Sequence, residues 1–150
     1  MMKRAYILIF IFAFSLTGIS SGEEDRAESE KQAIESILLD YVEGYWEGNV
    51  ERMERALHPN LVKRGIVSLP ETGRDLMEQL FASSMVEITR MNESKLSNVS
   101  LDDLKIRVSV LDVFKNVASA IVTSSEYFDY IHLVKWNGYW KIVNVLWVRM

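Results

Sequence analysis

The run FDYIHLVKWNGYWKIVNVLW, residues 128–147, decides the fold of this chain. Two stretches dense in branched and aromatic residues, about 128–136 and 139–148, flank the pair Asn137-Gly138. Asn-Gly between two apolar runs is the strongest short signal for a β-hairpin, because both central residues of the tight turn must accept positive φ. The sequence therefore predicts an antiparallel hairpin near the C-terminus.

Two further strands are predicted just upstream of this hairpin. From Leu104 onward, apolar residues recur at every second position (Ile106, Val108, Val110), a period typical of a half-buried strand. Lys115-Asn116 marks a turn, and the run 117–123 after it is dense in Val, Ile and Ala. The second half of the chain thus predicts successive antiparallel strands.

The first half carries helix signals instead. Ser29 and Gln32 have the spacing of a capping box. Apolar residues then follow at steps of three and four, as on one face of a helix, and Gly48 ends the pattern. The stripe comprises Ile34, Ile37, Leu38, Tyr41, Val42 and Tyr45. A second, shorter helix is predicted from Asn49 to His58, because proline disfavours helix at the residue before it.

The segment between this second helix and the strands is read in two parts. Residues 61–69 are rich in branched side chains and predict a first strand or an extended segment. A third helix is predicted from Thr72 and Asp75 to about Met91. Its proposed apolar face comprises Leu76, Leu80, Phe81, Ser84 and Ile88. The expected fold class is α+β, with three N-terminal helices packed on a curved, mainly antiparallel, cone-like sheet.

The first 22 residues read as a secretory signal peptide. Lys3 and Arg4 precede an apolar run over 5–19, and small residues follow up to Gly22. The alternative is an uncleaved membrane anchor, although the run is short for a bilayer span. Residues 23–28 form an acidic lead-in, and 29–150 form one domain. We therefore expect export to the periplasm or outside the cell, without a membrane attachment after cleavage.

Composition excludes several function classes. The chain holds 17 basic and 21 acidic residues, and loss of Lys3 and Arg4 moves the net charge from −4 to about −6, which argues against nucleic-acid binding. There is no cysteine, and this removes thiol catalysis and zinc–thiolate sites. No phosphate-binding loop, dinucleotide fingerprint or metal-spaced histidine pair occurs. Neither a cofactor nor a metal is expected.

Several segments of the chain resemble one known family. They are Tyr41–Val42–Glu43–Gly44–Tyr45, Ala56–Leu57–His58–Pro59–Asn60–Leu61, Lys63–Arg64–Gly65–Ile66 and the ending from Asp129 to Trp147. In element order the chain resembles the nuclear-transport-factor-two-like superfamily, which includes ketosteroid isomerase and polyketide cyclases. More narrowly, it resembles the "putative lumazine-binding" branch. The resemblance implies a cone-shaped fold. It does not select a function, because this fold serves isomerases, dehydratases and plain binders.

Seven residues are candidates for lining a pocket between helices and sheet: Tyr41, Tyr45, Trp46, His58, Tyr130, His132 and Trp147. Aromatic side chains suit flat apolar ligands. His58 can act as an acid or base, or it can cap the end of the second helix. Tyr130 and His132 share one face of a strand, and Asp129 shares the other with Ile131. That first face can line the pocket or form a dimer interface.

Charged and tryptophan residues leave further alternatives. Lys63 and Arg64 are adjacent on a strand, so at most one of them enters a pocket, and both can instead be solvated. Asp112 and Asp129 are the strand carboxylates that an enzyme would use as a base. Trp136 and Trp140 flank the Asn-Gly turn and are expected to pack on the hairpin.

Three functions are therefore considered. The first is an exported, non-catalytic domain that binds a small apolar or aromatic ligand. The second is a small lyase or isomerase using a pocket His or Asp as base. The third is a homodimeric interaction module without ligand. A buried carboxylate within hydrogen-bond reach of a tyrosine, facing an open cavity, would favour the enzyme.

Overall fold

The computed structural model describes residues 20–92 and 100–150. The predicted signal segment falls almost wholly outside these residues. In chain order the elements are α1 (Ser20–Glu47), α2 (Val50–Ala56), β1 (Leu57–Leu69), β2 (Arg74–Phe81), α3 (Ala82–Asn92), β3 (Arg107–Phe114), β4 (Val117–Thr123), β5 (Tyr127–Trp136) and β6 (Tyr139–Arg149). None of the helices in these residues has the length and apolar character needed to cross a membrane.

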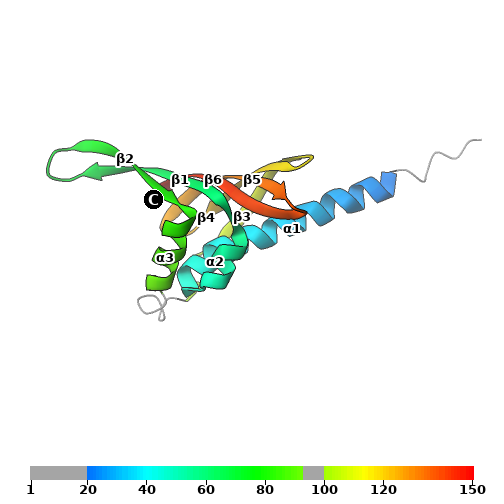
Figure 1. The fold of residues 1–150 in the computed structure, drawn as a ribbon, viewed down its shortest axis with the longest axis horizontal. Coiled ribbons are helices and arrows are strands. Elements are labelled where there is room, and N and C mark those ends of the chain that lie inside the picture. Colours follow the sequence, from blue (N-terminus) through cyan, green and yellow to red (C-terminus); the bar gives the residue numbers. More distant parts are fainter. Residues whose placement is uncertain (1–19, 93–99) are drawn as a thin grey trace, which may run out of the picture.

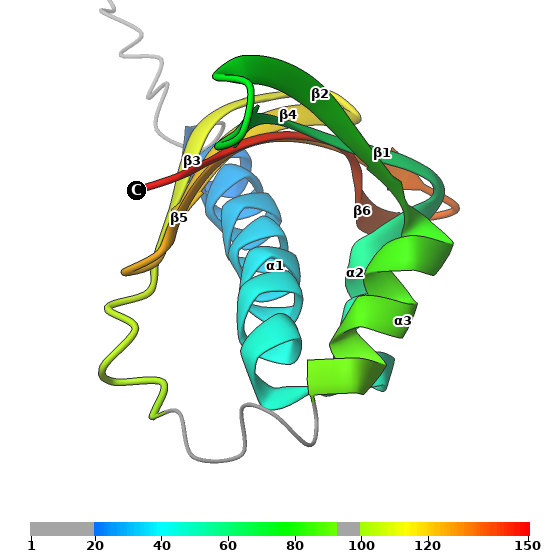
Figure 2. The same ribbon diagram turned by 90° about the vertical axis from the view of Figure 1, so that its left-hand side faces the viewer.

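The six strands form one curved sheet in the order β2-β1-β6-β5-β4-β3. All neighbouring pairs are antiparallel except β1 and β6, which run parallel. The three helices lie on the inner side of the curve, and the outer side is uncovered (Figure 2). The predicted α+β class, with helices on one face of a curved and mainly antiparallel sheet, is therefore confirmed.

The hairpin predicted from residues 128–147 is confirmed. β5 and β6 pair across the turn with Trp136 opposite Tyr139. Asn137 and Gly138 both have positive φ, at 51° and 86°, as the Asn-Gly signal requires. The strands over 107–114 and 117–123 also pair as predicted, with Phe114 opposite Val117 around the turn.

The first helix begins earlier than predicted. α1 starts at Ser20 and continues through residues 23–28, which are exposed as expected but helical rather than a lead-in. The predicted capping box does not form, because Ser29 lies inside the helix. The side-chain amide of Gln32 instead donates to the Glu28 carboxylate at 3.3 Å. The N-terminal part of α1 extends past the sheet, as Figure 1 shows, and its residues 22–29 are exposed, so no apolar stripe marks it in the sequence.

The prediction of a helix over residues 72–91 is wrong in its first half. Arg74–Phe81 is strand β2, which pairs residue by residue with β1 from Leu69↔Arg74 to Val62↔Phe81. Gly73, with φ of 65°, completes the turn between the two strands. Leu76 and Met77 are exposed, so the helical spacing of apolar residues did not mark a buried face. Helix α3 begins only at Ala82.

The β1–β2 hairpin projects from the body as an arm (Figure 1). Pairing of β1 with β6 ends at Gly65↔Trp147, so the arm from Ile66 to Met77 is held by its own two strands. By contrast, the core lies between α1 and the sheet. Its fully buried members include Ile34, Leu38, Met53, Leu61, Ile131, Leu133, Ile142 and Val145.

Helices α1 and α2 are joined by a charged cluster. Asp40 accepts hydrogen bonds from Arg52 at 3.0 Å and from Arg55 at 2.7 Å and 3.0 Å. Burial tends to raise the pKa of the Asp40 carboxyl, but the two guanidinium groups outweigh it and leave the pKa lowered. Arg52 also binds Glu43 and Glu47. These ion pairs hold α2 against α1.

Candidate functional site

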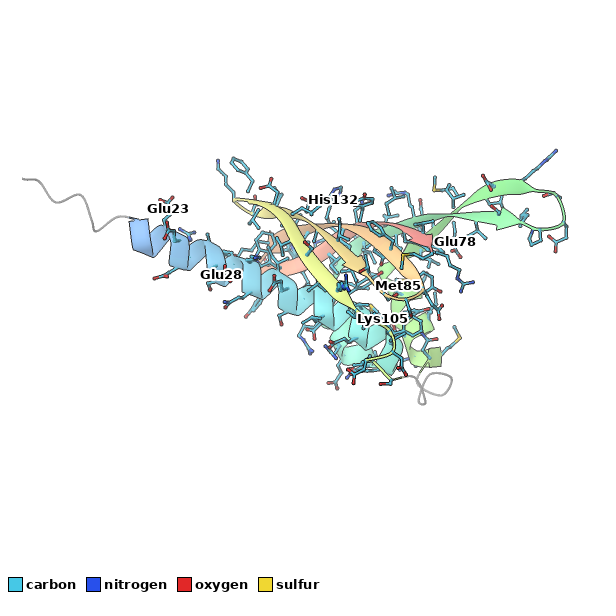
Figure 3. All side chains as sticks on the ribbon, turned by 180° about the vertical axis from the view of Figure 1, so that it is seen from behind. Glu23, Glu28, Glu78, Met85, Lys105 and His132 are labelled. Carbon is cyan, nitrogen blue, oxygen red and sulfur yellow. The ribbon has the colours of Figure 1, made fainter. Side chains whose placement is uncertain are left out.

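A cavity of about 210 Å³ lies between α1, α3 and the inner face of the sheet. Helix α1 contributes Tyr41, Val42, Tyr45 and Trp46, and α3 contributes Met85 and Ile88. The strands contribute Lys63, Glu78, Leu80, Val122, Tyr127, Asp129 and Trp147, and Ser124 follows β4. Figure 3 labels Met85 below the sheet, on the side of the helices. The volume suits a small organic molecule rather than a drug-sized one.

Strand register explains why the sheet residues of the cavity come together. Gly65 of β1 lies opposite Trp147 of β6, which lies opposite Asp129 of β5, which lies opposite Val122 of β4. This row crosses the sheet on its inner face. Lys63 is two residues before Gly65 and therefore shares that face, because side chains alternate along a strand.

The polar end of the cavity is a cluster of three side chains, Lys63, Tyr41 and Asp129. The Tyr41 hydroxyl donates to Oδ2 of Asp129 at 2.8 Å. Lys63 Nζ donates to the Tyr41 oxygen at 2.5 Å and lies 3.2 Å from the same Oδ2. The Lys63 and Asp129 side chains are only 11% and 6% exposed. They form a buried ion pair that a tyrosine bridges.

Burial sets the protonation of this cluster. Burial and, after it, the Asp129 carboxylate hold the pKa of Tyr41 well above its usual value, so the tyrosine is a neutral donor. Burial also lowers the pKa of Lys63, and the attraction of Asp129 only partly offsets this. The ammonium of Lys63 therefore depends on Asp129 for its stability inside the fold.

Two buried polar atoms have no hydrogen-bond partner among the described residues, Oδ1 of Asp129 and Nε1 of Trp147. Both belong to side chains that line the cavity. An unpaired buried acceptor or donor costs about 1–3 kcal/mol, and most such groups in folded proteins are paired. These two atoms are therefore unsatisfied polar groups in the wall of the cavity.

The remaining wall is aromatic. The Tyr127 ring contacts Tyr45, Trp46 and Trp147, with ring centroids 6.5, 6.2 and 5.7 Å apart. Tyr45 and Trp46 meet edge to face at 5.4 Å. Lys63 Nζ lies 5.5 Å from the centroid of the Trp147 ring and 5.3 Å from that of Tyr41. Packed rings of this kind form flat apolar walls beside the charged cluster.

Gly65 makes room for Trp147. A Cβ atom at Gly65 would lie 2.3 Å from Cε2 and 2.4 Å from Nε1 of the indole, closer than any real contact allows. The φ of Gly65 is not positive, so glycine is needed here for space and not for backbone conformation. The indole therefore lies directly against the β1 backbone.

Four of the seven predicted residues line the cavity: Tyr41, Tyr45, Trp46 and Trp147. His58 does not. It lies at the start of β1, where its ring meets Trp136 at 4.8 Å and Nδ1 accepts from the backbone N–H of Asn60. It does not cap α2 either, since the chain has already left the helix at Leu57. Ligand binding by the other four stays a prediction.

Tyr130 and His132 lie on the opposite face of the sheet from the cavity, so placing them in the pocket was wrong. Both are exposed, whereas Asp129 and Ile131 between and beside them are buried. Figure 3 shows His132 above the sheet, away from the helices. Its Nδ1 lies 3.3 Å from Nδ2 of Asn144 on β6. The alternation of side chains along β5 correctly placed Tyr130 and His132 on one face and Asp129 and Ile131 on the other. It does not indicate which of these faces the helices cover.

The cavity residues absent from the predicted set include three that carry a charge or a phenol ring: Lys63, Asp129 and Tyr127. The alternation of side chains along a strand already indicated that only one of Lys63 and Arg64 can face a pocket. In the structure that residue is Lys63, whereas Arg64 points outward and donates to Asn144 at 3.1 Å. The sequence places Asp129 on the correct strand face but does not name it as a pocket residue.

Asp112 is exposed on β3 and lies outside this cavity. Trp140 is buried beside the hairpin turn, and its Nε1 donates to Glu30 at 2.7 Å.

A metal site needs several His, Asp or Glu side chains close together. Across residues 20–92 and 100–150, no three His, Asp or Glu side chains lie close enough together to hold a metal ion.

Solved structures of several bacterial proteins share this fold. A protein from Silicibacter pomeroyi, described as NTF2-like and of unknown function, aligns with a TM-score of 0.63 at 15% identity, covering 83% of this chain and 98% of its own. A second, from Shewanella baltica, gives 0.60 at 17% identity, covering 82% and 95%. A third, from Methylobacillus flagellatus, gives 0.56 at 20% identity, covering 81% and 93%. At these identities the likeness shows the fold alone.

Comparison with curated proteins finds no match to this sequence. One family model does match, that of the family described as "putative lumazine-binding", over residues 29–148. The match covers the predicted domain almost from end to end, and every residue that lines the cavity falls within it. The chain belongs to this putative lumazine-binding family, and it has the fold of the NTF2-like proteins described above.

Proposed function

We propose that this protein binds a small organic ligand in the cavity between α1, α3 and the sheet. The observation that carries the proposal is the cavity of about 210 Å³, whose wall joins packed aromatic rings to the buried Lys63–Tyr41–Asp129 cluster. The aromatic wall around Tyr127 supplies apolar contact area beside it. The family match supports small-ligand binding in general terms.

We also propose that the protein works outside the cytoplasm. Support comes from the sequence, where a basic start, an apolar run and small residues up to Gly22 precede an acidic segment. The absence of cysteine makes the fold independent of the redox state of the compartment. N-terminal sequencing of the protein recovered from its source tests this proposal, and retention of Met1 to Gly22 would contradict it.

Ligand binding is tested by native mass spectrometry of the protein purified under mild conditions. We expect a mass adduct that is lost on denaturation. Ile88→Trp, which adds bulk to the α3 wall of the cavity, is expected to abolish the adduct. Leu76→Trp on the exposed arm is the matched control and should retain it. An adduct equally abundant in both variants would contradict binding in this cavity.

Catalysis is the second candidate, and one observation favours it. A buried carboxylate, Asp129, lies within hydrogen-bond distance of Tyr41 and lines the cavity. Its Oδ2 accepts from Tyr41 and Lys63, whereas Oδ1 has no partner among the described residues. The same mass spectrometry distinguishes the two functions, because an enzyme would convert the released compound to a product of different mass or retention time.

A homodimer is proposed from the outer face of the sheet. Tyr130, Leu146 and Val148 are neighbours on this outer face and are 52%, 50% and 51% exposed. They form an apolar patch on the face of the sheet that no helix covers. Exposed apolar patches often mark protein interfaces. Because the patch lies opposite the cavity, pairing through it would leave the cavity accessible.

The dimer is tested with Tyr130→Glu, which places a charge at the centre of the patch. We expect sedimentation to shift from the dimer mass to the monomer mass, since an interface rejects an unpaired buried charge. Tyr139→Glu at the exposed hairpin turn is the control and should leave the mass unchanged. A wild-type protein that sediments as a monomer at micromolar concentration would rule the dimer out.

A further inference from the structure

We propose that Lys63 forms an imine with an aldehyde that enters the cavity, so that the ligand is held by a reversible covalent bond. The inferred chemical class is an aldehyde carried on a small apolar or aromatic group. This inference rests on the proposed ligand-binding function and deepens it by naming the reacting group of the site. It follows from the position of the Lys63 amine, the groups around it and the balance of charge there.

Lys63 gives the cavity a primary amine. It is the only lysine among the described residues that line the cavity. Its side chain lies on the inner face of β1, with Nζ 5.3 Å from the centroid of the Tyr41 ring and 5.5 Å from that of Trp147. The side chain is buried except for 11% of its surface. A molecule in the cavity therefore meets a lysine amine, the nucleophile that proteins use toward carbonyl groups.

Two groups that can carry protons contact this amine. Nζ lies 2.5 Å from the Tyr41 oxygen and 3.2 Å from Oδ2 of Asp129. An amine attacks a carbonyl only when it is neutral, and Oδ2 is close enough to take the proton that Nζ must lose. Burial lowers the pKa of Lys63, while Asp129 and then Glu78 of β2 oppose this. The neutral amine is therefore more abundant than in a solvated lysine.

The reaction can be followed atom by atom. One ammonium proton passes from Nζ to Oδ2 of Asp129. The Nζ lone pair attacks the aldehyde carbon, and a C–N bond forms as the C=O electron pair moves to oxygen. That oxygen takes one proton from Nζ and one from Asp129 and leaves as water, while the nitrogen lone pair closes the C=N bond. An ammonium and an aldehyde thus become a protonated imine and one water, with Asp129 again ionised.

This reaction keeps the buried charges balanced. Before it an ammonium faces the Asp129 carboxylate, and after it a protonated imine does. The Tyr41 and Trp147 rings attract either cation. An aldehyde brings no charge of its own, whereas an added anion or cation would enter a buried site without a countercharge, which is costly. The ion pair therefore favours an uncharged carbonyl compound.

Reductive trapping with benzaldehyde tests the inference on the wild-type protein. This probe has one flat ring, which suits the wall formed by Tyr45, Trp46 and Tyr127. Sodium cyanoborohydride reduces a protonated imine to a stable amine, so a benzyl group stays on each lysine that has reacted. Peptide mapping by mass spectrometry then locates the label. At neutral pH we expect Lys63 to carry at least about tenfold more label than any other lysine, because a bound aldehyde is held beside its amine.

Lys141 is the matched control for this experiment. Burial lowers its pKa too, but it lies outside the cavity and donates to the backbone carbonyls of Glu54 and Arg55. Equal label on Lys141 and Lys63 would overturn the inference, because reactivity would then follow the pKa and not the cavity.

Variants assign the label to the site. Lys63→Arg keeps a positive charge for Asp129 but forms no imine, so it should lose the label, whereas Lys141→Arg should keep it. Ile88→Trp, which adds bulk to the cavity wall, should lower labelling of Lys63 about tenfold. Unchanged labelling of Lys63 in Ile88→Trp would overturn the inference, because the aldehyde would reach the amine without the cavity. Should Lys63→Arg fail to fold, peptide mapping of the wild-type protein decides.

The native adduct separates this inference from the proposed function. Cyanoborohydride is added before denaturation to the protein purified under mild conditions. An imine-bound ligand should then stay attached to Lys63, whereas a ligand held without a covalent bond is still released. Release of the adduct from a protein whose Lys63 takes no benzaldehyde would overturn the imine and leave the ligand-binding cavity. Absence of both the adduct and the label would overturn both.

Discussion

Asp129→Ala is expected to lower the free energy of unfolding by roughly 3 kcal/mol at neutral pH. The substitution leaves the ammonium of Lys63 buried without a countercharge and the Tyr41 hydroxyl without its acceptor. Removing one partner of a buried ion pair costs about 3–5 kcal/mol because the other charge is left uncompensated. Urea unfolding followed by tryptophan fluorescence measures the change.

A double-mutant cycle separates the ion pair from general loss of packing. Lys63→Met alone and Asp129→Ala alone should each destabilise the fold, whereas the double variant should recover part of the loss, because no buried charge remains. If the two losses simply add, the pair is not coupled and the cluster is not the buried ion pair described above.

The loss in Asp129→Ala should also depend on pH. Burial already lowers the pKa of Lys63 in the folded protein, so below that pKa the protonated amine costs stability, and the cost is relieved as the pH rises toward the unfolded-state value. Without Asp129 the cost is larger. The difference between variant and wild type should therefore shrink as the pH rises through the folded-state pKa of Lys63, where both proteins hold a neutral amine.

Gly65→Ala is expected to produce the second large effect, a loss of about 3 kcal/mol together with loss of ligand binding. The added methyl group would lie 2.3 Å from the Trp147 indole, so the ring must leave the β1 backbone, and overpacking of this kind typically costs about 1–3 kcal/mol. The space beside it is the cavity, into which the displaced ring would turn. Thermal unfolding measures the first consequence, and native mass spectrometry of the ligand adduct measures the second.

The Trp147 side chain provides the control for this prediction. In a Trp147→Ala background the clash is absent, so Gly65→Ala should then cost almost nothing. A similar cost in both backgrounds would mean that the glycine is required by the backbone and not by the indole.

The C-terminal strands were predictable because their signals are local. Asn137-Gly138 specifies a turn through the φ values that its residues must adopt, and strict alternation along each strand specifies two faces. The same locality explains the error at Arg74–Phe81. Leu76, Leu80 and Ile88 have helical spacing, but Leu76 and Leu80 belong to a strand because they pair with β1. Neither the β-propensity nor the apolar period of a segment shows whether another strand will pair with it.

The candidate site was predictable only in part. Tyr41, Tyr45 and Trp46 follow one another around a helix whose apolar stripe reveals its inner face, so the α1 wall could be named from sequence. The cavity residues on the strands could not be named in this way. Alternation along β5 separates Tyr130 and His132 from Asp129, but it does not show which of the two faces the helices cover.

The amino-acid sequence by itself determined the two helices between residues 29 and 56, the C-terminal hairpin, the α+β class and the family, since each rests on contacts between residues close in the chain or on motif spacing. Only the tertiary structure decided which face of the sheet is covered, and thus that Lys63, 66 positions from Asp129 in the chain, is its ion-pair partner. The physical reason is register: β1 joins the sheet beside β6, and that long-range pairing aligns Gly65, Trp147 and Asp129 in one row.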